Sequence, residues 1–241
     1  MNVDFPFPAE FTGDVLQAAM PDAPRSSAFS RDVIPWRVLA LFPQFMSVRG
    51  FDELRAYTAG EPCALKVYQL AHKIAAAFDR YIAYRPQMLL EWQAGRESHW
   101  QAQLWRELIR GHEKTNPPVL ARRLLEQLRL GKVADDGLPT RLSVFGISSL
   151  PPIYLELLKV AAASTDVHLF LLEPTADYWA ELLSPRERDR EARRHRLRDL
   201  PEDEDPELSG NALLASLGKT GRDFSWLLLD RLEPAEEIEM F

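Results

Sequence analysis

Residues 141–172 have the sequence RLSVFGISSLPPIYLELLKVAAASTDVHLFLL. Two short runs rich in apolar residues, 141–147 and 167–172, enclose a segment that favours a helix, because Pro151 and Pro152 suit a first helical turn. A strand, a helix and a second strand within about 30 residues are typical of a βαβ unit, in which the two strands run parallel. The stretch therefore predicts an α/β region in this chain.

Two strands alone make a poor sheet, so the predicted sheet needs more strands. Parallel strands are normally covered on both faces by other parts of the protein. We expect partner strands to come from elsewhere, including chain that would precede Met1. Where such strands are missing, an exposed sheet edge favours dimerisation or aggregation.

The chain before this region has the apolar periodicity of helices. Apolar residues recur at three- and four-residue spacing over residues 64–84, which predicts one long helix that Pro86 should end. Shorter helices are predicted around residues 104–109 and 120–128, and Gly131 can terminate the second. Six prolines should break the opening part into short helices and turns: Pro6, Pro8, Pro21, Pro24, Pro35 and Pro43.

These patterns together predict a helix-rich α/β protein in two parts. We expect a helical subdomain over residues 1–135 and a partial α/β domain over residues 136–241. Within the second part, residues 185–209 are dense in arginine and then in acidic residues, which predicts a solvated helix and a mobile loop. A DNA-binding arm is the alternative for this segment, and its deletion should leave the fold intact. Apolar residues that should pack back onto a core follow it: Leu213, Leu214, Leu217, Phe224, Trp226, Leu227 and Leu228.

Composition limits the class of protein. No apolar run approaches the roughly 20 residues that cross a bilayer, and the first residues lack the pattern of a secretory signal. We therefore expect a cytoplasmic protein with no membrane partner. Cys63 is the only cysteine, which excludes an intrachain disulfide. The net charge of −7 argues against indiscriminate coating of nucleic acid, although a local basic wall could still hold DNA.

No catalytic motif is complete. Gly218, Lys219 and Thr220 look like the end of a phosphate-binding P-loop, but Leu213 stands where that motif needs a glycine. We therefore expect a turn after a helix there. The chain contains no Glu-x-Lys nuclease signature, and its five histidines show no metal-ligand spacing. The sequence thus predicts no catalytic residue, no cofactor and no metal site.

A basic flank is predicted on the long helix. Lys66, Lys73 and Arg80 follow one another at seven-residue steps, which stacks them on one side of the helix away from its apolar stripe. Such a flank could follow a DNA backbone or could be an ordinary solvated face. Arg85 should lie on the buried side at the helix end, where it either satisfies terminal carbonyls and a carboxylate or reaches across a cavity toward a ligand.

Long segments of the chain resemble a known family. These are FPFPAEF (residues 5–11), KVYQLAHKIAAAFDRYIAYRP (66–86), WQAQLWREL (100–108), RLSVFGISSLPPIYLELL (141–158), VHLFLLEPTADYW (167–179) and NALLASLGKTGRDF (211–224). They resemble successive segments of RecC, the gamma subunit of the RecBCD helicase-nuclease (exodeoxyribonuclease V), in the same order and over nearly the whole chain. RecC proteins are much longer, so the resemblance implies an internal fragment of the amino-terminal half.

The resemblance implies both a fold and a function. The fold would be a degenerate superfamily 1 helicase-like, P-loop-type α/β domain with an inserted helical subdomain. Active relatives carry Gly-Asp…Gln after the strand that matches residues 141–147, whereas here Ile147 follows Gly146. The function would be non-catalytic. Such a subunit binds RecB-type and RecD-type helicase subunits, helps to split forked DNA, and guides the 3′-ended single strand to the place where the recombination hotspot Chi is recognised.

The resemblance also implies DNA-contacting residues. Asp79 and Arg85 match the family's FDxYxxYRP pattern, and Phe7 occupies an apolar position that lies near the strand. Ala76, Ala77 and Arg80 depart from the family pattern, so recognition of the same hotspot does not follow from it. Together with the basic flank, the expected DNA-binding set is Phe7, Lys66, Lys73, Asp79, Arg80 and Arg85. The alternatives are a module that only docks partner subunits, or an ATPase or nuclease in its own right.

Overall fold

The computed structural model describes residues 3–24, 28–59, 64–132, 138–175, 179, 182–184, 186–188, 190, 193 and 212–232. The chain forms two compact units, which we call the helical unit and the strand unit. The helical unit comprises residues 1–139 and 151–161, and the strand unit comprises residues 140–150 and 162–241. The helix between the two strands thus belongs to the helical unit. The expected domain boundary near residue 135 stays a prediction.

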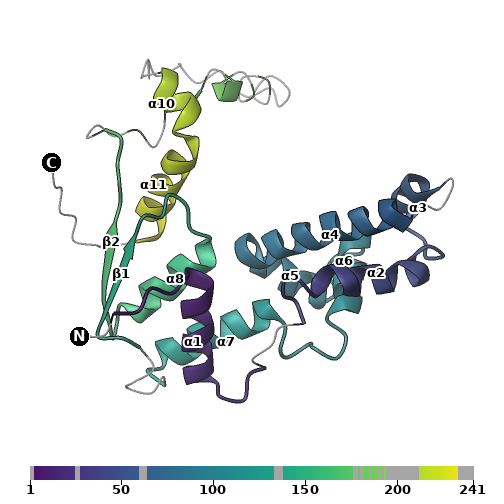
Figure 1. Ribbon diagram of the computed structural model, residues 1–241, viewed down its shortest axis with the longest axis horizontal. Coiled ribbons are helices and arrows are strands. Elements are labelled where there is room, and N and C mark those ends of the chain that lie inside the picture. Colours follow the sequence, from purple (N-terminus) through teal and green to yellow (C-terminus); the bar gives the residue numbers. More distant parts are fainter. Residues whose placement is uncertain are drawn as a thin grey trace. The chain divides into compact units, whose positions relative to one another are not determined.

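The helical unit contains the long predicted helix and seven others within its described residues (Figure 1). Residues 64–84 form one helix, as predicted. Pro86 separates it from the next helix and also begins that helix, since a proline is tolerated in a first turn, where its missing N–H is not needed. The helices are α1 (Pro8–Ala19), α2 (Ile34–Phe45), α3 (Asp52–Thr58), α4 (Ala64–Tyr84), α5 (Pro86–Gln93), α6 (Trp100–Leu108), α7 (Pro117–Arg129) and α8 (Pro152–Ala161).

One of the six prolines expected to break the opening part does not do so. Pro35 lies in the first turn of α2, where a helix begins, whereas Pro43 lies inside the same helix. Pro43 removes one backbone donor, but it is close to the end of the helix at Phe45, so little of the hydrogen-bond ladder is lost. The expected short helices and turns are present as α1, α2 and α3, and the expectation fails only at Pro43, where burial of the α2 face outweighs that single loss.

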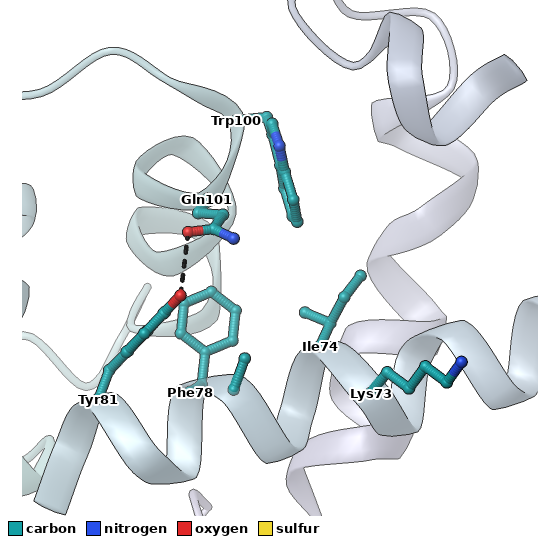
Figure 2. A pocket seen from close by; sticks show the side chains of 7 residues that line it. Lys73, Ile74, Phe78, Tyr81, Trp100 and Gln101 are labelled. Atoms are coloured by element: carbon teal, nitrogen blue, oxygen red, sulfur yellow. Dashed lines mark hydrogen bonds between the residues drawn. The ribbon is translucent and has the colours of Figure 1, made fainter. Parts of the chain in front are cut away.

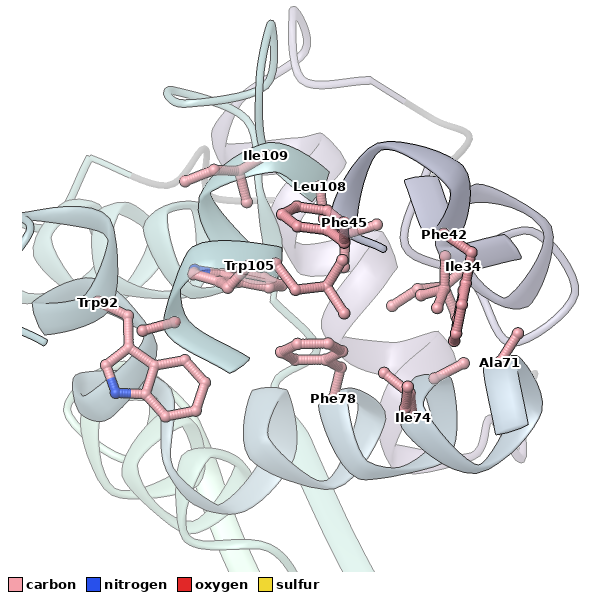
Figure 3. Close-up of a cluster of buried hydrophobic side chains, with 14 of the residues drawn as sticks. Ile34, Phe42, Phe45, Ala71, Ile74, Phe78, Trp92, Trp105, Leu108 and Ile109 are labelled. Carbon is pink, nitrogen blue, oxygen red and sulfur yellow. The ribbon is translucent and has the colours of Figure 1, made fainter. Parts of the chain in front are cut away.

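The core of the helical unit is built around aromatic side chains (Figure 3). Phe78 of α4 stacks on Trp105 of α6 at a centroid distance of 5.6 Å, and Phe29 approaches the same indole at 5.6 Å. The Trp105 Nε1–H donates to the Leu89 carbonyl at 3.1 Å, which satisfies the polar atom of this buried ring. The apolar stripe predicted on residues 64–84 is therefore the face of α4 that enters this core.

A second apolar cluster joins α1, α7 and α8. Val15, Leu124 and Leu157 are buried together there, one from each helix. Asn116 begins α7 and is fully buried, with its side-chain oxygen accepting from the Val119 N–H at 3.4 Å. Gly131 follows the helix at φ 62°, as expected of a helix-terminating glycine.

The strand unit contains a two-stranded parallel sheet within its described residues. β1 (Arg141–Phe145) pairs with β2 (Asp166–Phe170) in a register that sets Arg141 opposite Asp166 and Phe145 opposite Phe170. The prediction of parallel neighbouring strands is confirmed. β1 is shorter than predicted because the chain leaves the extended conformation at Gly146, where φ is 68°.

The last apolar block forms two further helices, α10 (Ala212–Leu217) and α11 (Lys219–Arg231). Phe224 and Leu228 are buried, as predicted. Leu213, Leu217 and Trp226 are exposed, so the prediction was wrong for them. α10 has only six residues, and α11 buries a single face. Only part of this apolar block can therefore point into the core.

The structure confirms a helix-rich α/β protein with a small parallel sheet. Most of the segment predicted to be mobile, residues 185–209, lies outside the described residues. None of the helices that the structure describes is both long and apolar enough to cross a membrane.

Candidate nucleic-acid interface

The basic flank of α4 consists of Lys66, Lys73 and Arg80. Lys73 and Arg80 are exposed, whereas Lys66 is half-buried with its Nζ 4.6 Å from the centroid of the Tyr57 ring. Seven residues of helix advance about 10.5 Å, so the three charges form an evenly spaced row along the axis. Among the described residues, none of the three forms an ion pair with a carboxylate. The row can therefore meet an external anion.

Asp79 is the only carboxylate of α4, and it is already paired. Its Oδ2 lies 2.9 Å from Arg31, which comes from the turn before α2. Burial raises the pKa of Tyr154 on α8, and the negative charge of Asp79 raises that pKa further, while Arg31 opposes the effect. Asp79 thus faces Arg31 and the α8 side of the helix. Sequence reasoning missed Arg31 and Tyr154 because no local pattern links them to α4.

Arg85 is exposed, which corrects the prediction that it lies on the buried side. The helical wheel fails there because α4 ends at Tyr84, and Arg85 has φ −139° and ψ 47°. Its backbone N–H still donates to the Tyr81 carbonyl at 2.8 Å. Within the described part of the chain its guanidinium has no carboxylate partner, so the side chain points to solvent and not into an ion pair.

Phe7 lies on a different element from the basic flank. It precedes α1 in an extended conformation with 80% of its surface exposed. α1 packs on α7 and α8. The structure therefore collects Lys66, Lys73 and Arg80 on one helix flank, turns Asp79 to another side of that helix, and leaves Arg85 and Phe7 on separate segments.

A cavity of about 180 Å³ lies beside the basic flank, between α4 and α6. Figure 2 shows Trp100 and Gln101 of α6 facing Phe78 and Tyr81 of α4. The Tyr81 hydroxyl donates to Gln101 Oε1 at 3.4 Å. Sequence reasoning missed this cavity because α4 and α6 meet only through packing. Its lining residues are Lys73, Ile74, Ala77, Phe78, Tyr81, Trp100 and Gln101.

The segment that looks like a P-loop is occupied by protein groups. A β-carbon added to Gly218 would lie 2.8 Å from the Trp179 ring, so this glycine allows the indole to approach closely. Lys219 lies in the first turn of α11, with its Nζ 2.6 Å from Glu187 and 2.9 Å from Asp223. Gly218 separates α10 from α11, in agreement with the expected turn after a helix.

Arg222 holds the same region together from inside. It is buried and donates to the Leu182 carbonyl and to both oxygens of Glu187, at 2.9 Å for the closer one. Hydrogen bonds from Arg222 and then Lys219 hold the pKa of Glu187 well below its usual range. Glu187 belongs to the segment 185–209, whose deletion we expected to leave the fold intact. That expectation needs correction, because the deletion would remove Glu187 and leave the buried Arg222 with only the more exposed Asp223, at 3.1 Å, as a carboxylate partner.

A second cavity, of about 210 Å³, lies where β1 and β2 end in the strand unit. The Glu173 carboxylate lines it and accepts hydrogen bonds from Trp179 Nε1 at 2.6 Å and from Ser225 Oγ at 2.7 Å. The carboxyl ends of parallel strands are a common ligand position. Here the polar group is already engaged by neighbouring side chains.

Comparisons with known proteins give one consistent result. The family "RecC, N-terminal domain" matches residues 1–241. The RecBCD enzyme subunit RecC of Escherichia coli (strain K12) is 34% identical over 100% of this chain, which spans 24% of that protein. The subunit of Haemophilus influenzae is 30% identical over 95% of this chain, which spans 25% of that protein. In the RecC of Mycolicibacterium smegmatis, 67% of this chain aligns at 33% identity.

The chain spans about a quarter of the length of the first two relatives, and the match covers both units of the structure. The helix that carries the basic flank and the two parallel strands lie inside the matched region. A family match along the whole chain, together with two relatives at 30% identity or more, identifies this protein as a member of the RecC family, in which it corresponds to the N-terminal domain.

Proposed function

We propose that this chain is a non-catalytic DNA-handling and scaffold part of a RecBCD-type helicase-nuclease. The observation that carries the proposal is the basic flank of α4, a row of three cations with no carboxylate partner among the described residues. Phosphate binding is driven by cations that release counterions from the nucleic acid. Three cations at even spacing suit a backbone that runs along the helix.

The charge of the whole chain does not oppose this proposal. The net charge is −7, yet α4 carries Lys66, Lys73 and Arg80 against a single carboxylate, Asp79. That carboxylate is paired with Arg31, so it does not neutralise the flank. A basic surface on a mostly acidic protein attracts DNA locally and leaves the other surfaces for water or partner subunits.

The proposed partners follow from family membership. We propose that the chain acts with RecB-type and RecD-type helicase subunits, on single-stranded and forked DNA. Guidance of the 3′-ended strand and recognition of Chi belong to the same proposal, with Asp79, Arg85 and Phe7 as contacts. Ala76, Ala77 and Arg80 depart from the family pattern, so the hotspot need not have the same sequence. We also propose that the protein is cytoplasmic.

We propose further that the α/β part derives from a helicase-like, P-loop-type domain and has no ATPase or nuclease centre of its own. The support is the surroundings of Lys219, which Glu187 and Asp223 engage, and of Gly218, which Trp179 covers. Phosphate would have to displace these groups. Sustained ATP hydrolysis that co-purifies with the folded chain, or magnesium-dependent DNA cleavage, would overturn this part.

The central test is binding of single-stranded DNA by the full chain at low and moderate salt. A variant with Lys66→Gln, Lys73→Gln and Arg80→Gln should bind more weakly, and its salt dependence should flatten by about two units of slope for three lost contacts. The matched control carries Lys114→Gln, Arg122→Gln and Arg123→Gln, three exposed cations outside α4. Equal losses in both variants would remove the flank as the site, and absence of binding by the unmodified chain at low salt would refute the DNA-handling proposal.

A docking-only module is the second candidate, and one observation favours it. Phe145, Phe170 and Leu172 are exposed at or just beyond the strands, and exposed apolar groups often mark protein interfaces. If the chain bound RecB-type and RecD-type subunits but no DNA at any salt concentration, this second function would replace the first.

A further inference from the structure

The cavity between α4 and α6 combines three features that a nucleobase requires. Its wall contains three aromatic side chains, the stem of Lys73 lines its edge with the ammonium directed along α4, and one polar side chain, Gln101, faces inward (Figure 2). We propose that this cavity binds a single unstacked base of a DNA strand whose phosphates follow the basic flank. The inference rests on the proposed DNA-handling function and adds a base-binding subsite to it.

The aromatic groups provide the stacking surface. Phe78 is buried and forms the floor, whereas Tyr81 and Trp100 are half-buried and leave ring surface open. Single-stranded DNA is commonly held by aromatic side chains on which bases stack, because every base has an apolar face. Trp100 is fixed by its position at the start of α6 and by the neighbouring Phe51 ring at 6.1 Å. It can therefore receive a base with little loss of side-chain freedom.

The size of the cavity limits the ligand to one ring system. Sites for drug-sized ligands and cofactors usually measure about 300–1,000 Å³. The volume here is about 180 Å³, which is too small for a nucleotide cofactor but suits a base inserted from a strand outside. The sugar and phosphate would then remain at the surface of α4, where the basic flank lies.

The polar groups fit a base edge. Gln101 Oε1 accepts from the Tyr81 hydroxyl at 3.4 Å, which orients the amide. Its Nε2 has no acceptor among the residues that the structure describes. An amide N–H donor in an aromatic cavity can bind a carbonyl or ring nitrogen on a base.

The basic flank runs past the cavity on the surface of α4. The stem of Lys73 lines the cavity and its ammonium is directed along the helix, so a phosphate bound there would lie on the helix surface beside the cavity and not inside it (Figure 2). Lys66 and Arg80 lie about two helical turns away in each direction, on the same side of α4. This charge pattern favours a polyanion over an apolar side chain of a partner subunit as the occupant.

The experiment compares two oligonucleotides of equal length, oligo(dT) and a chain of abasic sites, each titrated with the full protein at low salt. The unmodified chain should bind oligo(dT) about tenfold more tightly, as expected for one stacked base. Trp100→Leu should bring this ratio close to one and leave the affinity for the abasic chain unchanged. Trp36→Leu is the matched control, since Trp36 is an exposed indole on α2 and should leave the ratio unchanged.

A second variant guards against a folding defect. Ala77→Met adds volume inside the cavity from α4, so it should reduce the same ratio without removing an aromatic contact from the core. A ratio that stays near tenfold in both Trp100→Leu and Ala77→Met would overturn the base-binding subsite and leave the proposed function intact. A ratio of one in the unmodified chain would overturn it too.

Two other results separate the causes of failure. If neither oligonucleotide binds to the unmodified chain, the proposed function fails together with the subsite. If Trp100→Leu weakens association with a RecB-type subunit and leaves the oligonucleotide ratio unchanged, the cavity holds a protein side chain and the inference is wrong.

Discussion

Arg222 and Arg85 carry the same charge in opposite surroundings. Arg222 is 4% exposed and donates to Glu187 and to a backbone carbonyl, so its charge is compensated inside the protein. Arg85 is exposed and has no carboxylate partner among the described residues. Removing a partner of Arg222 should therefore lower the stability of the fold, whereas removing the Arg85 side chain should weaken binding.

Glu187→Gln should destabilise the strand unit at neutral pH by about 2 kcal/mol, because it leaves the buried charge of Arg222 with one carboxylate partner, the more exposed Asp223 at 3.1 Å. The pKa of Glu187 is lowered in the folded chain, so the stabilisation is present above the unfolded pKa of about 4.3 and is lost as the pH falls below it. The variant should therefore lose less stability than the unmodified chain between about pH 5 and pH 3. Urea unfolding at several pH values measures both effects, and identical acid sensitivity in the two proteins would contradict the prediction.

Arg85→Ala should leave the free energy of unfolding within about 0.5 kcal/mol of the unmodified chain, as is usual for exposed positions. In a complex reconstituted with partner subunits, the same change should weaken strand capture or hotspot response. A lost phosphate contact would flatten the salt dependence by about one unit, whereas a lost base contact would relax sequence preference by about 1–3 kcal/mol. Unfolding of the helical unit by this substitution would show that Arg85 has a structural role instead.

At the scale of single elements, α7 depends on one buried side chain. Asn116 caps the helix and also donates from Nδ2 to Gln93 Oε1 at 3.1 Å and to the His112 carbonyl at 3.0 Å. It thereby ties the start of α7 to the end of α5. The contact of Asn116 with α5 exists only in the packed unit, because Gln93 is 23 positions away along the chain.

Asn116→Ala should destabilise the helical unit by about 2 kcal/mol, because it removes the cap and leaves buried acceptors without donors. Asn116→Ser should cost less, since its hydroxyl can still accept from the Val119 N–H and can donate one hydrogen bond. Urea unfolding followed by tryptophan fluorescence can rank the two variants, as Trp92 and Trp105 are buried in the same unit. If both substitutions changed stability by less than about 0.5 kcal/mol, the cap would not stabilise the helical unit in this way.

At the scale of the whole molecule, the small sheet decides how the chain behaves alone. Within the described residues β1 and β2 pair only with each other, which leaves an outer edge on each strand. Phe145 and Phe170 lie opposite one another in the register and are both exposed. Exposed strand edges with apolar side chains favour pairing with another chain.

We therefore expect the isolated chain to self-associate with rising concentration, as sedimentation velocity can measure. Phe145→Lys should shift the distribution toward the monomer, because it places a charge on the exposed sheet. Leu217→Lys is the control, since Leu217 is equally apolar and 82% exposed but lies on α10. A chain that stays monomeric at every concentration would contradict the prediction, and an equal effect of both lysines would indicate general solubility instead.

Local spacing in the amino-acid sequence is enough to predict the periodic parts of the fold. The bounds of the long helix at residues 64–84 and the parallel strands around residues 141–147 and 167–172 follow from periodicity and proline placement. Membership of the RecC family also follows from the order of the matching segments along the chain. Periodic features are visible because residues three, four or two positions apart share a face whatever else the chain does.

Contacts between residues far apart in the sequence could be identified only in the folded chain. Arg31 reaches Asp79 across 48 positions, and Trp179, which follows β2 in the sequence, covers Gly218. Trp100 and Gln101 face α4 because of the way α6 packs on it, which no spacing within either helix specifies. The exposure of Arg85 could not be predicted either, because the chain turns at the end of α4 and Arg85 no longer has helical geometry. Local periodicity fixes the face of a residue, but the packing of elements against one another fixes its neighbours.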